Sequence, residues 1–188
     1  MQPERLVLKS QPGANTMRTL ITGAAGAGTT TLAKALAAAI AGVALDTDDF
    51  FWLRAEPPFD ERRDPQLRRS LLLDALSAHE RVVLSGCVMG WGAEIENEFD
   101  LVIFLYVETE IRLQRLRARE VARWDFIDDA FIEWARLYDS GPPEGRSLPK
   151  HNAWLAQRAC RVIRLAGNTS VDENIARVEE YLRQSRMI

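Results

Sequence analysis

The chain has 188 residues, of which 47% are hydrophobic and 27% are charged, and its net charge is −3 at pH 7. This length fits about one domain, large enough to bury a core without disulfides or a structural metal. The slight acidic excess argues against a nucleic-acid partner, because general nucleic-acid binders carry a basic excess. Only three of the 24 basic residues are lysines, and the rest are arginines.

The cysteines and the apolar segments indicate the cellular compartment of the protein. Cys87 and Cys160 lie in separate apolar segments without CxxC spacing, so we expect neither a disulfide framework nor a zinc site. The longest apolar stretch, residues 32–45, is too short to span a bilayer. We therefore expect a cytoplasmic protein without a membrane partner, a monomer or homodimer. Residues 1–17 are expected to be an N-terminal extension, and residues 18–188 a single domain.

Short apolar runs alternate with segments of helical periodicity. In chain order we expect a strand at 18–22, a helix at 29–41, a strand at 43–45, a loop at 54–65, a helix at 66–79, strands at 81–84 and 100–107, helices at 109–123 (with Thr109 as a candidate N-cap) and 128–138, a loop at 140–149, a strand at 161–165 and a helix at 171–186. The strand at 100–107 is apolar without alternation, which is typical of a strand buried on both faces. This order predicts an α/β three-layer sandwich, a five-stranded parallel sheet with helices on both faces. Ligands of such folds bind at the carboxyl ends of the strands.

A glycine-rich segment joins the first expected strand to the first expected helix. It reads G-A-A-G-A-G-T-T over residues 23–30 and fits the phosphate-loop spacing G-x-x-x-x-G-K-[ST], except that Thr29 stands where lysine is usual. Backbone N–H groups and the helix N-terminus would bind phosphate here, and the Thr30 hydroxyl would bind Mg²⁺. The alternative is a strand-to-helix turn without a ligand. The candidate nucleotide-binding residues of this segment are Gly23, Gly26, Ala27, Gly28, Thr29, Thr30 and Thr31.

The missing lysine leaves the phosphate charge without its usual partner. Thr29 can donate a neutral hydrogen bond but supplies no charge. Either another cation replaces the lysine, or phosphoryl transfer is slow, or the chain only binds nucleotide. Lys34 lies one turn further along the expected helix and is not expected to substitute.

In their order along the chain, four segments resemble the P-loop small-molecule and nucleoside monophosphate kinases, the adenylate/cytidylate kinase-like group. They are residues 23–30, 46–51, 99–105 with the arginine-rich helix that follows, and 165–168. The resemblance covers residues 18–181. It implies ATP and Mg²⁺ as cofactors, a lid or insert at about residues 112–150, and a loop at Gly167 and Asn168 that lies against adenine.

Three aspartates follow the second expected strand. Carboxylates in this position can hold Mg²⁺ and accept the proton of an attacking hydroxyl. By the resemblance to uridine- and riboside-type kinases Asp48 is the candidate catalytic base, and Asp46 contacts the metal or the acceptor; Asp49 is a further candidate for acceptor binding. The alternative is that an aspartate caps a following helix. An acid cluster favours a hydroxyl acceptor, because a phosphate acceptor needs little help from a base.

Arginines share one face of the expected helix 109–123. Arg112, Arg115, Arg119 and Arg123 are spaced three, four and four residues apart. By the resemblance, arginines of this helix close over the phosphates, so Arg115 and Arg119 are the candidate catalytic cations that replace the lysine. The alternative is a solvated helix face.

Aromatic and basic residues elsewhere are candidates for acceptor binding. Rings beside arginines suit a planar or sugar-like ligand with an anionic group. These candidates are Trp52, Arg54, Trp91, Arg123 and Arg146. The alternative for each aromatic residue is a place in the core. Similar kinases often carry Asp-Gly at the end of the third strand, where this chain has Ser85 and Gly86.

The function expected from these residues is ATP-dependent transfer of a γ-phosphoryl group to a hydroxyl or nucleotide acceptor of low molecular weight. The alternative is a nucleotide-binding regulatory protein without transfer activity, which the missing lysine would favour. A GTPase switch is disfavoured, because the chain contains no [NT]-K-x-D motif.

Overall fold

A computed structural model describes residues 16–53, 61–142 and 144–184. The expected extension at residues 1–17 lies outside this range except for its last two residues, and Met17 already begins a strand. Arg54 also lies outside the described residues. None of the helices in the described ranges combines the length and apolar character that a transmembrane segment requires.

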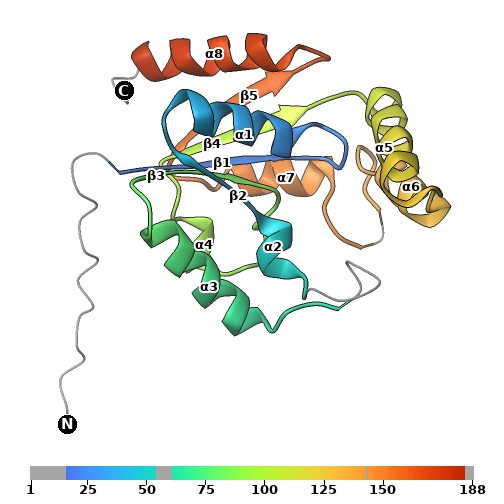
Figure 1. Ribbon diagram of the computed structural model, residues 1–188, viewed down its shortest axis with the longest axis horizontal. Helices are drawn as coiled ribbons and strands as arrows, with labels where there is room; N and C mark the ends of the chain where they lie inside the picture. Colours follow the sequence, from blue (N-terminus) through green and yellow to red (C-terminus); the bar gives the residue numbers. More distant parts are fainter. Residues whose placement is uncertain (1–15, 54–60, 143, 185–188) are drawn as a thin grey trace.

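The strands form one parallel sheet in the order β2-β3-β1-β4-β5. Their bounds are β1 Met17–Gly23, β2 Val43–Asp46, β3 Arg81–Ser85, β4 Leu101–Tyr106 and β5 Arg161–Ala166. In register, Ile21 lies beside both Ser85 of β3 and Ile103 of β4. The predicted five-stranded parallel sheet is therefore confirmed, and all five strands end at the same edge (Figure 1).

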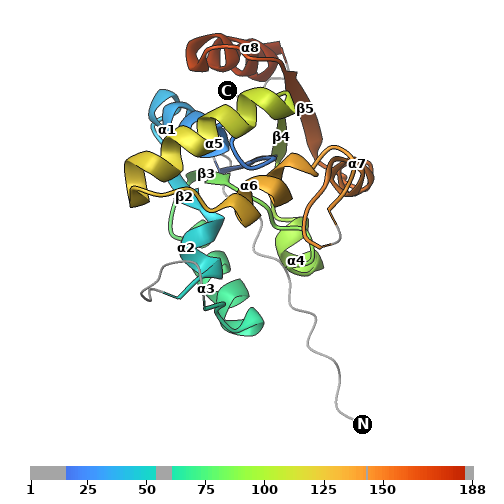
Figure 2. The same ribbon diagram turned by 90° about the vertical axis from the view of Figure 1, so that its right-hand side faces the viewer.

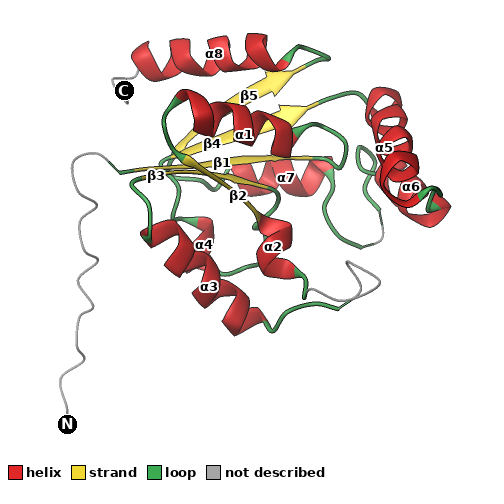
Figure 3. Ribbon diagram, in the orientation of Figure 1, coloured by secondary structure: helices red, strands yellow, loops and turns green. Residues whose placement is uncertain are grey.

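Helices cover both faces of this sheet (Figure 3). Their bounds are α1 Thr29–Ala39, α2 Thr47–Phe51, α3 Pro65–Ser77, α4 Ala93–Glu96, α5 Thr109–Trp124, α6 Asp129–Arg136, α7 Leu148–Leu155 and α8 Val171–Gln184. Leu36 of α1 and Val178 of α8 belong to the core on one face, and Leu72 of α3 and Ile95 of α4 to the core on the other. The predicted three-layer arrangement is thus confirmed.

α5 and α6 stand apart from these two layers. Figure 2 shows them in front of the carboxyl ends of the strands, where they form a wall across that edge of the sheet. Leu113 and Leu116 of α5 pack with Ile132 and Ala135 of α6 in a small core of their own. This pair of helices occupies the region expected to form a lid.

Three helices were not predicted, and one cap was misplaced. α2 and α4 have only five and four residues, too few for a periodic pattern. α7 begins at Leu148, inside the expected loop 140–149, and its start carries a signal that could have been recognised: Ser147 is the N-cap and Pro149 lies in the first turn. Glu108, not Thr109, occupies the N-cap of α5, and the Thr109 hydroxyl donates a hydrogen bond to Asp139.

Candidate functional site

The phosphate loop has the geometry that binding to phosphate requires. It joins the end of β1 to the start of α1, and Gly28 forms the N-cap of α1 with a φ of 97°, a conformation that favours glycine. The first hydrogen bond of the helix runs from the Leu32 N–H to the Gly28 carbonyl. The N–H groups of residues 29–31 therefore point past the start of the helix, toward the cleft that these residues line.

Asp46, at the end of β2, connects the start of α1 to the end of β3. Its Oδ2 atom accepts a hydrogen bond of 2.9 Å from the Thr30 hydroxyl and one of 2.8 Å from the Ser85 hydroxyl. Its Oδ1 atom accepts a 3.1 Å bond from the Asp48 N–H and so caps α2. Asp46 therefore caps a helix, as the alternative interpretation predicts. The same carboxylate also contacts the Thr30 hydroxyl, which is expected to bind metal. One carboxylate beside one hydroxyl, with substrate phosphates, is a ligand set that suits Mg²⁺.

Asp48 lies on the first turn of α2 and lines the same cleft. Its side chain is open to solvent, but the surrounding walls still desolvate the carboxylate. This desolvation, together with the charge of Asp46, raises the pKa of Asp48, while the charge of Arg146 and a hydrogen bond with Trp52 partly offset the increase. A carboxylate with a raised pKa, open to a cleft, is suited to accept a proton.

The predicted arginine stripe divides into two parts with different environments. Arg112 is fully buried, whereas Arg115, Arg119 and Arg123 line the cleft. The Arg115 guanidinium donates to the Ala27 carbonyl at 3.4 Å and to the Asn168 side chain at 2.6 Å, so it lies beside the phosphate loop. Arg119 is half exposed and contacts Glu120 at 3.4 Å. Three members of the stripe thus line the cleft, and the solvated-face alternative fails for Arg112.

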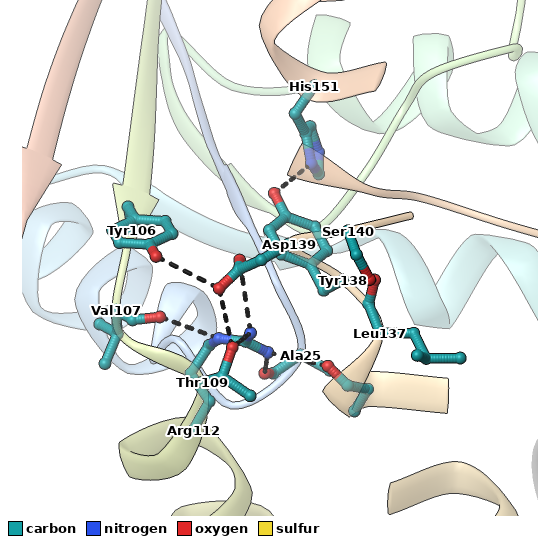
Figure 4. Close-up of polar contacts among 11 residues, drawn as sticks. Ala25, Tyr106, Val107, Thr109, Arg112, Leu137, Tyr138, Asp139, Ser140 and His151 are labelled. Carbon is teal, nitrogen blue, oxygen red and sulfur yellow. Dashed lines mark hydrogen bonds and ion pairs between the residues drawn. The ribbon is translucent and has the colours of Figure 1, made fainter. Parts of the chain in front are cut away.

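Arg112 holds the phosphate loop against α5 and α6 (Figure 4). Its guanidinium donates to the carbonyls of Val107 at 2.9 Å, Ala135 at 3.2 Å and Ala25 at 3.5 Å. Its charge is balanced by Asp139, whose carboxylate lies 3.7 Å away. Because Ala25 belongs to the phosphate loop and Ala135 to α6, this one side chain fixes the position of the loop relative to α5 and α6.

Asp139 is itself fixed by the residues around it. Its Oδ2 atom accepts hydrogen bonds from the Tyr106 hydroxyl at 3.2 Å and from the Thr109 hydroxyl at 2.8 Å (Figure 4). Desolvation and the neighbouring negative charge of Asp139 raise the pKa of Tyr106, so the phenol keeps its proton and remains a donor. The carboxylate that balances Arg112 is therefore held at the end of β4.

Arg146 faces the cleft from the segment before α7. Its guanidinium carbon lies 5.6 Å from the centre of the Trp134 ring. Its Nε atom is buried and has no hydrogen-bond partner among the described residues. Its charge lowers the pKa of Asp48, so a cation and the candidate base face the same space. The expectation that Arg146 lies in the acceptor region agrees with this position.

The structure separates some predicted residues from the cleft. Trp91 is 4% exposed, stacks on Phe51 with a centroid distance of 6.1 Å, and carries the Arg68 guanidinium 4.2 Å from its ring. The stacking of a ligand on Trp91 is therefore wrong, because both faces of this ring are covered by protein. Ala27, the exposed Asp49, Gly167 and Asn168 are not among the described residues that line the cleft, although Asn168 accepts a hydrogen bond from the cleft residue Arg115.

The cleft is about 870 Å³ and gathers most of the remaining candidates. Those that line it are Gly23, Gly26, Gly28, Thr29, Thr30, Thr31, Asp46, Asp48, Trp52, Arg115, Arg119, Arg123 and Arg146. Four aromatic residues that were not predicted also line it, Trp124, Phe126, Phe131 and Trp134. The sequence could have indicated them, because four aromatic residues lie within eleven positions of the region expected to form the lid.

Comparisons with known proteins agree with this geometry. The model of the AAA domain family matches residues 20–130. An uncharacterized protein of Bacillus subtilis (strain 168), YqaC, is 40% identical over 172 residues, which is 86% of this chain and 95% of that protein.

Solved structures show the same fold at lower identity. Shikimate kinase from Bacteroides thetaiotaomicron has a TM-score of 0.56 at 21% identity, over 89% of this chain and 98% of that chain. Shikimate kinase from Acinetobacter baumannii in complex with shikimate has a TM-score of 0.56 at 20% identity, over 91% of this chain and 94% of that chain. The fold is that of the P-loop kinase group.

Proposed function

Since the chain belongs to the AAA domain family and has the fold of the P-loop kinases, we propose that it is an ATP-dependent phosphotransferase that moves the γ-phosphoryl group to a hydroxyl of a small-molecule acceptor. The observation that carries this proposal is the meeting of Thr30, Asp46 and Asp48 beside the phosphate loop in one cleft. A hydroxyl for metal, a carboxylate for metal and a second carboxylate with a raised pKa are together what such a transfer needs.

Thr30 and Asp46 would hold Mg²⁺ together with the phosphates of ATP. When bound, the metal would neutralise charge on the phosphate oxygens. The N–H groups at the start of α1 bind the phosphates, and the Arg115 guanidinium beside Ala27 supplies positive charge that Thr29 lacks. Arg119 and Arg123 add further positive charge along the same wall of the cleft.

Asp48 performs the proton transfer in this proposal. The acceptor hydroxyl gives its proton to the Asp48 carboxylate as its oxygen forms a bond to the γ-phosphorus. The bond from that phosphorus to the bridging oxygen breaks, and ADP leaves. Because desolvation raises the pKa of Asp48, its carboxylate is a stronger base than an aspartate in water.

Arg146 is suited to bind an acceptor with an anionic group. One of the solved kinases with this fold holds shikimate, a hydroxylated ring acid. In this chain the unpartnered Nε atom of Arg146 can donate to a carboxylate or phosphate while an acceptor hydroxyl faces Asp48.

A single-turnover assay with γ-labelled ATP tests the proposal. Enzyme, Mg²⁺ and labelled ATP are mixed with a panel of small hydroxy acids, sugars, nucleosides and nucleoside monophosphates, and the labelled product is separated. We expect transfer to at least one hydroxyl acceptor and a loss of about 10²–10⁴-fold in rate for Asp48→Asn.

Asp129→Asn is the matched control, because Asp129 is an exposed carboxylate next to the cleft residue Asp128 and does not line the cleft itself. Its rate is expected to stay within about twofold, since a surface charge far from the reacting atoms contributes little. Tight binding of ATP and Mg²⁺ with no transfer to any acceptor, and no effect of Asp48→Asn, would instead indicate a nucleotide-binding regulatory protein.

A further inference from the structure

Four aromatic side chains form one wall of the cleft, from the end of α5 through α6. We call Trp124, Phe126, Phe131 and Trp134 the aromatic wall. Phe131 and Trp134 lie about one helical turn apart, with ring centroids 6.0 Å apart and planes at 19°. The wall therefore offers flat apolar surface next to the catalytic cleft.

Two rings of this wall are unusually open to solvent. Phe126 is 60% exposed and Trp124 is 38% exposed, although both line a cleft rather than the outer surface. Aromatic rings left open in a concave site favour a ligand that covers them, because each ring buries a large apolar area when it is covered.

Positive charge lies against both ends of the wall. The Arg123 guanidinium is 5.7 Å from the Trp124 ring centre, and the Arg146 guanidinium is 5.6 Å from that of Trp134. The buried Nε atom of Arg146 lacks a hydrogen-bond partner among the described residues, so it remains able to bind an anion. Arg146, Asp48 and the aromatic wall line the same cleft, so an anion bound to Arg146 would share that space with the candidate base.

From this arrangement we infer that the acceptor carries three groups: a flat aromatic ring, an anionic group and the hydroxyl that receives phosphate. The ring lies on the aromatic wall, where Trp124 and Phe126 are open to solvent, the anion binds Arg146, and the hydroxyl faces Asp48. This inference rests on the proposed function and narrows its substrate class. A nucleoside monophosphate and a hydroxylated aromatic acid share this chemistry, whereas shikimate has no aromatic ring.

Calorimetric titration of the full chain with ADP and Mg²⁺ present measures binding without transfer. The probes are CMP and AMP (aromatic and anionic), cytidine (aromatic and neutral), 4-hydroxybenzoate (an aromatic acid) and shikimate (a non-aromatic acid). We expect at least one anionic aromatic probe to bind about tenfold or more tightly than shikimate and than cytidine. If CMP or AMP binds more tightly than 4-hydroxybenzoate, the acceptor belongs to the nucleoside monophosphates. If 4-hydroxybenzoate binds more tightly, the acceptor is a hydroxylated aromatic acid.

Variants of the wall separate ring contact from general damage. Trp134→Leu and Phe126→Leu are each expected to weaken the best aromatic probe about three- to tenfold, from loss of a ring contact. Phe126→Leu, which keeps the ring beside Arg146, is also expected to leave shikimate binding within twofold. Ile127→Ala is the matched control, because Ile127 is exposed beside Phe126 but does not line the cleft. Arg146→Gln is expected to reduce the preference for CMP over cytidine.

The inference is overturned if shikimate binds as tightly as every aromatic probe, or if no aromatic probe binds below about 1 mM, the upper range of usual KM values. It is also overturned if the wall variants weaken shikimate and aromatic probes equally. Because these titrations measure binding without phosphoryl transfer, an absence of transfer would refute the proposed function, and the binding data would still test this inference. Transfer to a non-aromatic acceptor, unaffected by Trp134→Leu, would refute this inference alone.

Discussion

A buried histidine makes the stability of this protein sensitive to acid. His151 of α7 has no exposed surface, and its ring nitrogens lie 3.1 Å from the Thr22 hydroxyl and 2.6 Å from the Tyr138 hydroxyl. Burial, and next the positive charge of Arg146, lower the pKa of His151 from 6.5 to about 3. The folded protein therefore holds this ring neutral over a pH range in which the unfolded chain protonates it.

The size of the effect follows from the two pKa values. Between pH 6.5 and 3 the unfolded state binds more protons at this position, so the free energy of unfolding decreases as the pH falls. The slope is about 1.4 kcal/mol per pH unit. From pH 6.5 to 4.5 the loss from His151 alone amounts to about 2.5 kcal/mol, and above pH 6.5 the residue contributes little to the pH dependence.

Urea unfolding of the wild type and of His151→Gln at several pH values measures this loss. Carboxylates titrate in both proteins, so the difference between the two stability curves isolates His151. We expect the variant to be less stable than the wild type at pH 7, because a packed ring is removed, and the gap to change by about 2.5 kcal/mol in favour of the variant between pH 6.5 and 4.5. Parallel curves for the two proteins would refute the reasoning. Since Thr22 immediately precedes the phosphate loop, ATP binding by the wild type should weaken in the same acid range.

Three further predictions concern the cleft and its support. Asp48→Asn should leave the free energy of unfolding at pH 7 unchanged or slightly higher, because the raised pKa of Asp48 means that its ionisation opposes folding. Urea titration at pH 7 measures this free energy, and a clear decrease would contradict the prediction. Arg112→Gln should lower the free energy of unfolding by about 2–4 kcal/mol, because it leaves Asp139 unpaired and removes donors to buried carbonyls; thermal unfolding checks it. Thr29→Lys should change the single-turnover rate by less than about tenfold, whereas Arg115→Gln should lower it by about 10³-fold or more, as loss of an arginine at transferring phosphate does. A large gain from Thr29→Lys would show that Arg115 does not replace the lysine.

The fold and the phosphate loop could be predicted because their signals are local. Apolar runs alternating with helical periodicity lead to a parallel sheet covered on both faces, and the observed sheet and layers agree. The motif at residues 23–30 consists of neighbours in the chain and the helix that follows, so the motif alone predicts the loop geometry that is observed at the start of α1. The helices α2 and α4 were not predicted because they are too short to show a helical periodicity in the sequence.

The roles of individual side chains depended on contacts between distant segments. Helical spacing places Arg112 and Arg115 on one stripe, but it contains no information on where Asp139 and the Ala25 carbonyl lie. Glycines on both sides of Trp91 suggested an accessible ring, and the packing of Phe51 and Arg68 buried it instead.

The sequence by itself therefore determined the class of fold, the phosphate loop and the set of charged groups around it, because periodicity and short motifs act through neighbours in the chain. Only the tertiary structure decided which arginine is a buried support and which ones line the cleft. It also decided that Asp46 joins Thr30 and Ser85, and that an aromatic wall completes the cleft. The physical reason is that these roles arise from burial and pairing across strand ends and lid helices, which lie far apart in the chain and meet only when it folds.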